Sequence, residues 1–133
     1  MTAKDDTTLI QTDGRRRRSE RNKQLIVAAM VSLIRAGDLD PNAAEIAKKA
    51  GVGVRTVFRL FEDMDSLYAE MTRQIQAEIM PRVEAPFESD DWKERCFEAC
   101  ARRAEVYESI MMLRISANAR RSNSKYLKAD YIQ

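Results

Sequence analysis

Apolar residues at helical spacing predict two short helices between Ala43 and Glu62. The first helix carries a stripe at i, i+3, i+4 and i+7, which is the spacing of one helix face. That stripe consists of Ala43, Ile46, Ala47 and Ala50. Gly51 follows, and because glycine has no Cβ it can adopt the left-handed conformation that ends a helix abruptly. Val52 is expected to fill the corner between the two helices.

The second helix of this segment combines an apolar face with a polar, basic one. Its apolar arc is predicted to contain Val54, Val57, Phe58 and Phe61. Arg55, Thr56 and Arg59 fall on the other side, where guanidinium and hydroxyl groups can reach base edges and phosphates in a major groove. Two helices joined by a glycine turn are typical of a helix-turn-helix. The alternative is an ordinary helical hairpin with a solvated charged face.

Flanking patterns predict one helix before this segment and one after it. Ser19 is the expected N-cap of the earlier helix, which runs to Ala36. Its apolar stripe is Leu25, Ile26, Ala29, Met30, Leu33 and Ile34. Asp63 is the expected cap of the later helix, which ends or kinks at Pro81. The stripe of that helix is Met64, Leu67, Tyr68, Met71, Ile75 and Ile79. The prediction is an all-α chain with a three-helix head and a fourth helix leading out of it.

The C-terminal part of the chain is predicted to be helical after a linker at residues 81–89. Ser89 is the expected N-cap, and an apolar stripe recurs at three and four residues. The stripe is either plain core or the lining of a small-molecule cavity. The candidate ligand-pocket residues are Trp92, Cys96, Cys100, Tyr107 and Met111. Another helix is expected to begin at Lys125, which suggests that the chain is a fragment with an incomplete C-terminal domain.

The N-terminal residues show no periodicity and are predicted to be a flexible tail, residues 1–18. The tail ends in the run Arg15, Arg16, Arg17 and Arg18. Such a run is often only a solvated segment, but here it precedes a DNA-reading unit. We therefore expect it to contact phosphates or a minor groove, with binding that depends steeply on salt.

Composition narrows the class of protein further. Hydrophobic residues make up 44% of the 133 positions and charged residues 33%, with only 4 Gly and 3 Pro, which favours a mostly helical domain. The net charge of +2 is too small to indicate nucleic acid by itself, but residues 15–24 are strongly basic and residues 64–95 are rich in acids. No stretch approaches the roughly 20 apolar residues of a membrane span, and the N-terminus is too polar for a signal peptide. A cytoplasmic protein that does not bind membranes is the expectation.

The 2 cysteines, Cys96 and Cys100, lie on one helical face, and the chain has no His and no CxxC motif. We therefore expect no metal site and no cofactor. Small core residues kept reduced are the favoured interpretation of the cysteines, with redox sensing as the alternative. No nucleophile–base pair or phosphate-cradling glycine loop supports an enzyme.

The segment from Arg18 to Ile79 resembles the TetR family of transcriptional regulators. The residues that carry the resemblance are Ile46-Ala47, Ala50-Gly51-Val52, Thr56, Phe58, Phe61 and Leu67. They align without a gap to the family pattern IA-x-x-AGVS-x-[GAP]-[TSA]-[LFI]-Y-x-[HY]-F-x-[SND]-K-x-x-L. The resemblance implies an all-α homodimer with a DNA-binding head of homeodomain-like type. It also implies a C-terminal helical domain that dimerises and binds an effector, whose binding releases a palindromic operator.

The resemblance divides the chain into a DNA-binding domain at 20–80 and the start of an effector-binding and dimerisation domain at 81–133. Gly53 stands where the family has a capping Ser, and Arg55 where a small residue is common. Phe58 replaces a Tyr and Met64 a Lys, so two phosphate contacts are expected to be weaker. The predicted DNA-binding residues are Arg15, Arg16, Arg17, Arg18, Asn42, Ala44, Gly53, Val54, Arg55, Thr56, Phe58, Arg59 and Met64.

Two functions follow as expectations. The first is a sequence-specific, ligand-responsive repressor that binds double-stranded operator DNA as a dimer and responds to an apolar small-molecule effector. The second, motivated by Phe58 and Met64, is a helical module that binds small molecules or proteins and has lost DNA binding.

Overall fold

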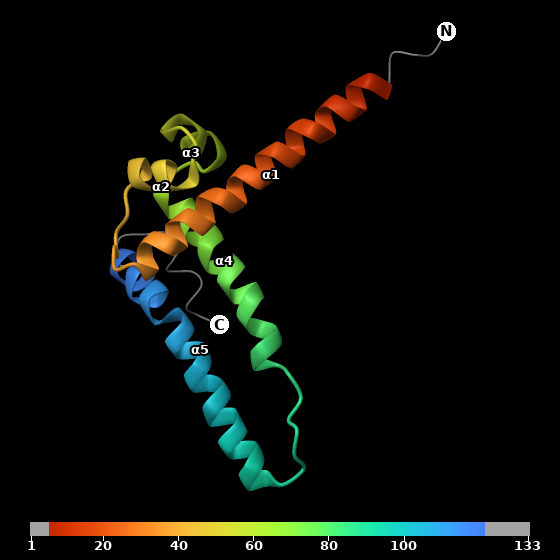
Figure 1. Cartoon of the computed structure of the whole chain (residues 1–133), viewed down its shortest axis with the longest axis vertical. Coiled ribbons are helices and arrows are strands. Elements are labelled where there is room, and N and C mark those ends of the chain that lie inside the picture. The colour runs from red at the N-terminus through yellow and green to blue at the C-terminus, as the bar shows by residue number, and fades with distance from the viewer. Residues whose placement is uncertain (1–5, 122–133) are drawn as a thin grey trace.

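The computed structural model describes residues 6–121, with side chains from residue 13 onward, and shows an all-α chain (Figure 1). Its helices are α1 (Asp6–Arg35), α2 (Ala43–Ala50), α3 (Val54–Leu60), α4 (Met64–Val83) and α5 (Trp92–Arg121). The described residues contain no β-strand. The predicted all-α class is therefore confirmed for these residues, while the helix expected from Lys125 lies outside them.

The helices form two parts that share one core. We use the term head for residues 19–62, in which α2 and α3 pack against the C-terminal half of α1. The antiparallel helices α4 and α5 lie side by side and extend away from the head (Figure 1). The chain turns between α4 and α5 at their far end, so the C-terminal end of α5 returns to the head. The N-terminal half of α1 projects in another direction.

The core lies where the head meets α4 and the end of α5. Its most fully buried apolar side chains come from all five helices and from the residue that follows α3. They include Ile26, Met30, Ile34, Ile46, Ala47, Val57, Phe61, Leu67, Tyr68, Met71 and Leu113. Burying one such side chain stabilises a fold by about 1.5–3 kcal/mol. The predicted stripes of α1 and α4 are confirmed in outline, although Leu25 is 41% exposed.

The predicted start of the first helix at Ser19 is wrong, because α1 begins at Asp6. Residues 6–18 are thus helical and do not form a separate tail, whereas residues 1–5 lie outside the described part. No Pro interrupts this stretch, and an i,i+4 ion pair of 3.0 Å joins Arg17 to Asp13. Gly14 is the poorest helix former of the stretch, and a glycine inside a helix costs only about 1 kcal/mol. Because this stretch has no apolar stripe, hydrophobic periodicity could not predict that it is helical.

Side chains cap α4 and α5. Asp63 caps α4 as predicted: its carboxylate accepts a 2.7 Å bond from the backbone N–H of Ser66, whose hydroxyl accepts a 3.2 Å bond from the Asp63 N–H. The cap of α5 is Asp91, not Ser89. Its carboxylate accepts from the N–H groups of Lys93 and Glu94 at 2.9 and 3.1 Å. The hydroxyl of Ser89 instead accepts a 3.1 Å bond from the Asp91 N–H.

Pro81 does not end α4, which continues to Val83. A proline in the last turn removes only one helical hydrogen bond, and the chain leaves the helix shortly afterwards. The connection to α5 is therefore residues 84–91. The predicted linker, residues 81–89, began three residues too early and ended two residues too early. None of the helices within residues 6–121 has the length and apolar character needed to cross a membrane.

Arg120 joins the end of α5 to two other parts of the chain. Its guanidinium pairs with the carboxylates of Asp40, in the loop before α2, at 2.9 Å and of Asp65, at the start of α4, at 3.3 Å. The same group lies 4.9 Å from the ring centroid of Tyr68. The C-terminal end of α5 is thereby held against the head.

Candidate nucleic-acid interface and α4–α5 cavity

Local capping interactions define both ends of α2, the second of which is the turn that leads to α3. Asn42 accepts 3.0 Å bonds from the N–H groups of Ala44 and Glu45, and the Glu45 carboxylate accepts a 3.0 Å bond from the Asn42 N–H. This capping box starts α2. At the other end Gly51 has φ of 71°, in the left-handed region, as predicted. The half-buried Val52 packs against the core and fixes the corner.

The inner face of α3 is narrower than the sequence pattern predicted. Val57 is 1% exposed and Phe61 6%, so these two residues anchor the helix to the core. Val54 and Phe58 are 41% and 48% exposed, so their assignment to the buried arc is wrong. A helix of only 7 residues packs over a single line of contact, and the residues flanking that line remain in solvent.

The outer face of α3 presents Arg55 and Arg59 beside Val54 and Phe58. Both arginines are exposed, and neither forms an ion pair within the described residues. Thr56 is half-buried at the edge of this face. Gly53, which precedes α3, is exposed and provides no side-chain cap. The result is a short helix whose free surface combines guanidinium groups with an apolar strip.

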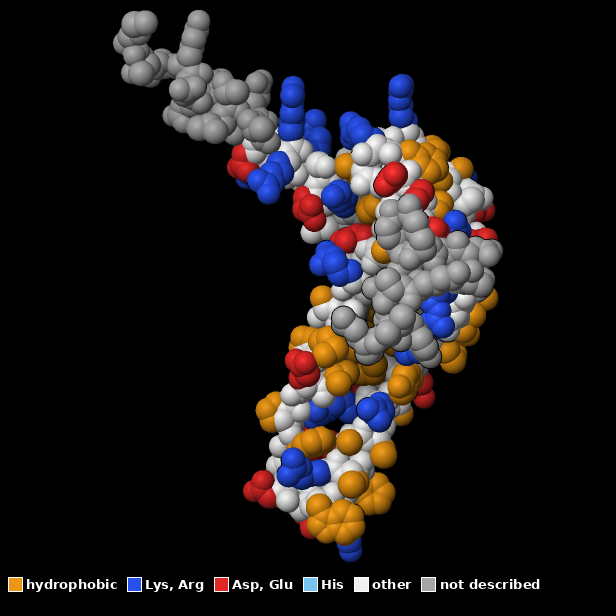
Figure 2. Space-filling view, turned by 180° about the vertical axis from the view of Figure 1, so that it is seen from behind, with side chains coloured by type: hydrophobic (Ala, Val, Ile, Leu, Met, Phe, Trp, Pro, Cys, Tyr) orange, Lys and Arg blue, Asp and Glu red, His pale blue; other side chains and the backbone are white. Residues whose placement is uncertain are grey.

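The neighbouring end of α2 adds positive charge to this region. Residues 43–60 contain 4 basic residues and 1 acidic residue, and Lys48 and Lys49 are exposed in the last turn of α2. Basic side chains project from α1 and the head at the same end of the molecule, with acidic side chains among them (Figure 2). Such a surface attracts a polyanion.

The remaining predicted DNA-binding residues of the head differ in their exposure. Asn42 and Ala44 are exposed at the start of α2. Met64, at the start of α4, is half-buried and packs against the core. An apolar side chain in that position supports packing and adds no charge to the surface.

Arg15, Arg16, Arg17 and Arg18 are all exposed on the projecting part of α1. Because they belong to a helix, successive side chains point about 100° apart, so the run is spread around the helix. Arg15 and Arg18 share one side, whereas Arg16 and Arg17 point elsewhere. The pair of Arg17 with Asp13 is highly exposed and contributes well under about 1 kcal/mol. The four arginines therefore do not face a single surface.

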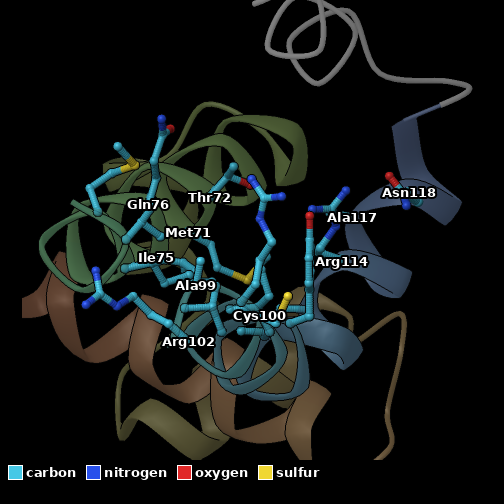
Figure 3. Close-up of a pocket in the computed structure, with 18 of the residues that line it drawn as sticks. Met71, Thr72, Ile75, Gln76, Ala99, Cys100, Arg102, Arg114, Ala117 and Asn118 are labelled. Carbon is cyan, nitrogen blue, oxygen red and sulfur yellow. The ribbon is translucent and has the colours of Figure 1, made fainter. Parts of the chain in front are cut away.

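A cavity of about 740 Å³ lies between α4 and α5 (Figure 3). Its walls are mainly apolar, and the volume is in the range of sites that hold small molecules. The apolar lining includes Met71, Ile75, Ile79, Val106, Ile110 and Leu113. Met80, Val83 and Phe87 line it near the turn between the two helices.

The structure separates the five predicted pocket residues. Cys100 and Tyr107 line the cavity. Trp92, Cys96 and Met111 do not line it, and Trp92 and Met111 are 68% and 55% exposed. The interpretation of the cysteines as core residues is wrong, since both are exposed. Helix α5 carries apolar residues on two opposite faces, and periodicity alone could not decide which of them meets α4.

Sequence reasoning did not identify the polar residues of the cavity. Thr72 and Gln76 of α4 and Asn118 of α5 line it, together with Arg102, Arg103, Arg114 and Arg121. None of the lining residues in the described part of the chain is acidic. The sequence did contain a signal for these residues. Several arginines of α5 lie three or four positions from apolar residues, which places them on the same helix face.

The described residues contain no group of three or more His, Cys, Asp or Glu side chains placed to hold a metal ion. No protein-family model, curated protein or solved structure matches the chain.

Proposed function

We propose that this protein is a cytoplasmic, TetR-like transcriptional regulator that binds operator DNA through α2 and α3. In this proposal residues 20–80 form the DNA-binding domain, with a head of homeodomain-like type, and α3 is the recognition helix. The protein acts by binding and not by catalysis. In the same proposal the protein binds a palindromic operator as a homodimer and represses transcription until an effector binds.

The outer face of α3 is the observation that carries the proposal. A short helix with Arg55 and Arg59 exposed, and with Val57 buried behind them, has the form required to enter a major groove. A guanidinium can donate two hydrogen bonds to the O6 and N7 atoms of guanine. The exposed Phe58 and Val54 can contact thymine methyl groups or the sugar–phosphate surface from the same face.

The turn that precedes α3 supports the same proposal. The capping box at Asn42 and the left-handed Gly51 set the direction of α2 and α3 independently of any ligand. Their interactions are local, so the geometry of the two helices is preorganised for DNA. The exposed Lys48 and Lys49 would add non-specific attraction to phosphates.

A helical binding module that has lost DNA binding is the second candidate. Met64 favours it, because the half-buried side chain supplies no phosphate contact at the start of α4. The cavity between α4 and α5 would then be the functional site. The two candidates make opposite predictions for duplex DNA.

Binding of a fluorescent random-sequence duplex, measured by anisotropy across a salt series, separates the candidates. We expect the protein to bind the duplex at low salt. The logarithm of the association constant should fall linearly with the logarithm of the salt concentration, and the slope should steepen by about 0.9 for each phosphate contacted. A variant with Arg55→Gln and Arg59→Gln should weaken binding. An Arg73→Gln variant serves as the control, because Arg73 lies on α4, is exposed and pairs with Glu70 at 2.6 Å. Absence of binding at low salt would support the binding module instead.

A further inference from the structure

The cavity between α4 and α5 has an uneven distribution of polar groups. Toward the head it is lined by Thr72 and Gln76 from α4 and by Arg114 and Asn118 from α5 (Figure 3). Toward the turn between the helices the α4 side and the connection contribute Met80, Val83 and Phe87. On the α5 side, Arg102 and Arg103 also lie toward the turn, so the cavity carries arginines at both ends, and its middle, between Ile79 and Ile110, is apolar.

The arginines that line this cavity are not equivalent. Arg102 is engaged within the protein: it pairs with Glu98 at 2.5 Å, donates to the carbonyls of Ala85 and Pro86, and lies 5.2 Å from the Phe87 ring centroid. It thereby ties α5 to the connection after α4. In Figure 3 it lies on the opposite side of the view from Arg114.

Within the described residues neither Arg103 nor Arg114 forms an ion pair, and of these two only Arg114 lies over an aromatic ring. Its guanidinium lies 5.8 Å from the centroid of the Tyr107 ring, and both residues line the cavity. The stacking holds the cation beside an apolar space while its hydrogen-bond donors remain available. Because Arg114 is exposed, water partly screens its charge, and selectivity for an anion comes from the two hydrogen bonds that a guanidinium can donate to a carboxylate.

From this arrangement we propose that the cavity binds an elongated apolar molecule with a single carboxylate at one end. The carboxylate lies at the head-proximal end, where Arg114 donates two hydrogen bonds and Asn118 can donate a further one. The hydrocarbon part extends between Ile79 of α4 and Ile110 of α5 toward Phe87. The absence of acidic side chains in the described lining favours an anionic ligand over a cationic one.

Calling such a ligand an effector rests on the function proposed above, but its binding does not. The experiment is therefore done on the full chain without DNA, by isothermal titration calorimetry with dodecanoate, 1-dodecanol and dodecylamine. We expect dodecanoate to bind at least about tenfold more tightly than either of the others, because only the carboxylate can pair with Arg114. Shortening the chain to octanoate should weaken binding by about fourfold for each methylene removed.

Variants test the orientation of the ligand. Arg114→Gln should weaken dodecanoate binding by at least about tenfold and leave dodecanol binding unchanged, and Arg114→Lys should restore part of the loss. Arg103→Gln, which alters the lining three turns away, should change dodecanoate binding less than twofold. Arg82→Gln is the matched control, since Arg82 is exposed on α4 and does not line the cavity.

Equal affinities of the unmodified protein for dodecanoate and dodecanol would overturn the proposal, whatever the variants do. A loss with Arg82→Gln as large as that with Arg114→Gln would show general charge attraction and would overturn it as well. A larger loss with Arg103→Gln than with Arg114→Gln would overturn the proposed orientation. Failure of the protein to bind DNA would leave all of these measurements unaffected.

Discussion

The hydroxyl of Ser116, near the C-terminal end of α5, donates a 2.7 Å hydrogen bond to the backbone carbonyl of Leu39, in the loop before α2. Because a hydroxyl carries one hydrogen, the 3.1 Å bond between Ser116 and Tyr68 must be donated by the Tyr68 hydroxyl. Ser116 is 1% exposed and Tyr68 is fully buried. One small side chain thus connects α5, α4 and the head.

Replacing Ser116 with alanine should destabilise the protein. The change leaves the Leu39 carbonyl and the Tyr68 hydroxyl without their partner in a buried site, at a cost of about 1–3 kcal/mol. Urea denaturation followed by circular dichroism measures the loss. Ser109→Ala is the control, because the Ser109 hydroxyl bonds at 2.7 Å only to the Val106 carbonyl of its own helix. Equal effects of the two substitutions would contradict a connecting role for Ser116.

Tyr68 should make stability depend on pH at the alkaline end. Burial raises the pKa of Tyr68 above its ordinary value of 10.0, although the positive charge of Arg120 opposes part of that shift. The contribution of the buried phenol is complete below pH 10 and is lost as the pH rises through the higher folded-state pKa, because the unfolded chain ionises first. The free energy of unfolding should therefore fall faster above about pH 10 than it does in Tyr68→Phe. Parallel pH profiles of the two proteins would exclude this contribution.

Arg55→Ala and Arg59→Ala should each reduce the preference for an operator selected from a random duplex library. A bidentate contact to guanine is worth about 1–3 kcal/mol of discrimination, so the preference should fall by about fivefold to 150-fold. Binding competition between selected and random duplexes measures the effect. Arg73→Ala, on the exposed side of α4, should leave the preference unchanged. An unchanged preference in both head variants would remove α3 from base recognition.

Replacing Arg15, Arg16, Arg17 and Arg18 with glutamine should weaken binding to selected and random DNA by the same factor. Since only Arg15 and Arg18 share one side of α1, we expect at most two phosphate contacts to be lost. The salt slope should become shallower by at most about 1.8, which corresponds to two phosphates. A loss confined to the selected operator would mean that these arginines read bases.

Gly53→Ser and Gly51→Ser should have opposite effects on stability. Gly53 has φ of −76° and open space where a Cβ would lie, so a serine there can cap α3 and stabilise the protein by a few tenths of a kcal/mol. Gly51 has φ of +71°, which strains any residue with a Cβ, and we expect a loss of about 1 kcal/mol. Thermal denaturation of the two variants provides the comparison. Destabilisation by both variants would contradict the capping role expected of a serine at position 53.

The sequence was sufficient to predict the α2–α3 turn and the cap of α4. Gly51 and Asp63 act on backbone groups within a few residues, so their interactions are local and can be read from spacing. The buried stripes of α1 and α4 followed from periodicity, because each of those helices has one dominant apolar face. The projecting part of α1 has none, and its helical state could not be predicted in that way.

Local pattern by itself determined the all-α class, the glycine turn and the basic outer face of α3. Tertiary structure alone decided that Phe58 faces solvent, that Cys100 and Tyr107 line the α4–α5 cavity while Trp92 does not, and that Ser116 reaches Leu39. The physical reason is distance along the chain. Caps and turns form between neighbouring residues. Which of the two apolar faces of α5 is buried depends instead on where α4 and the head lie, and the spacing of residues within α5 carries no information about that.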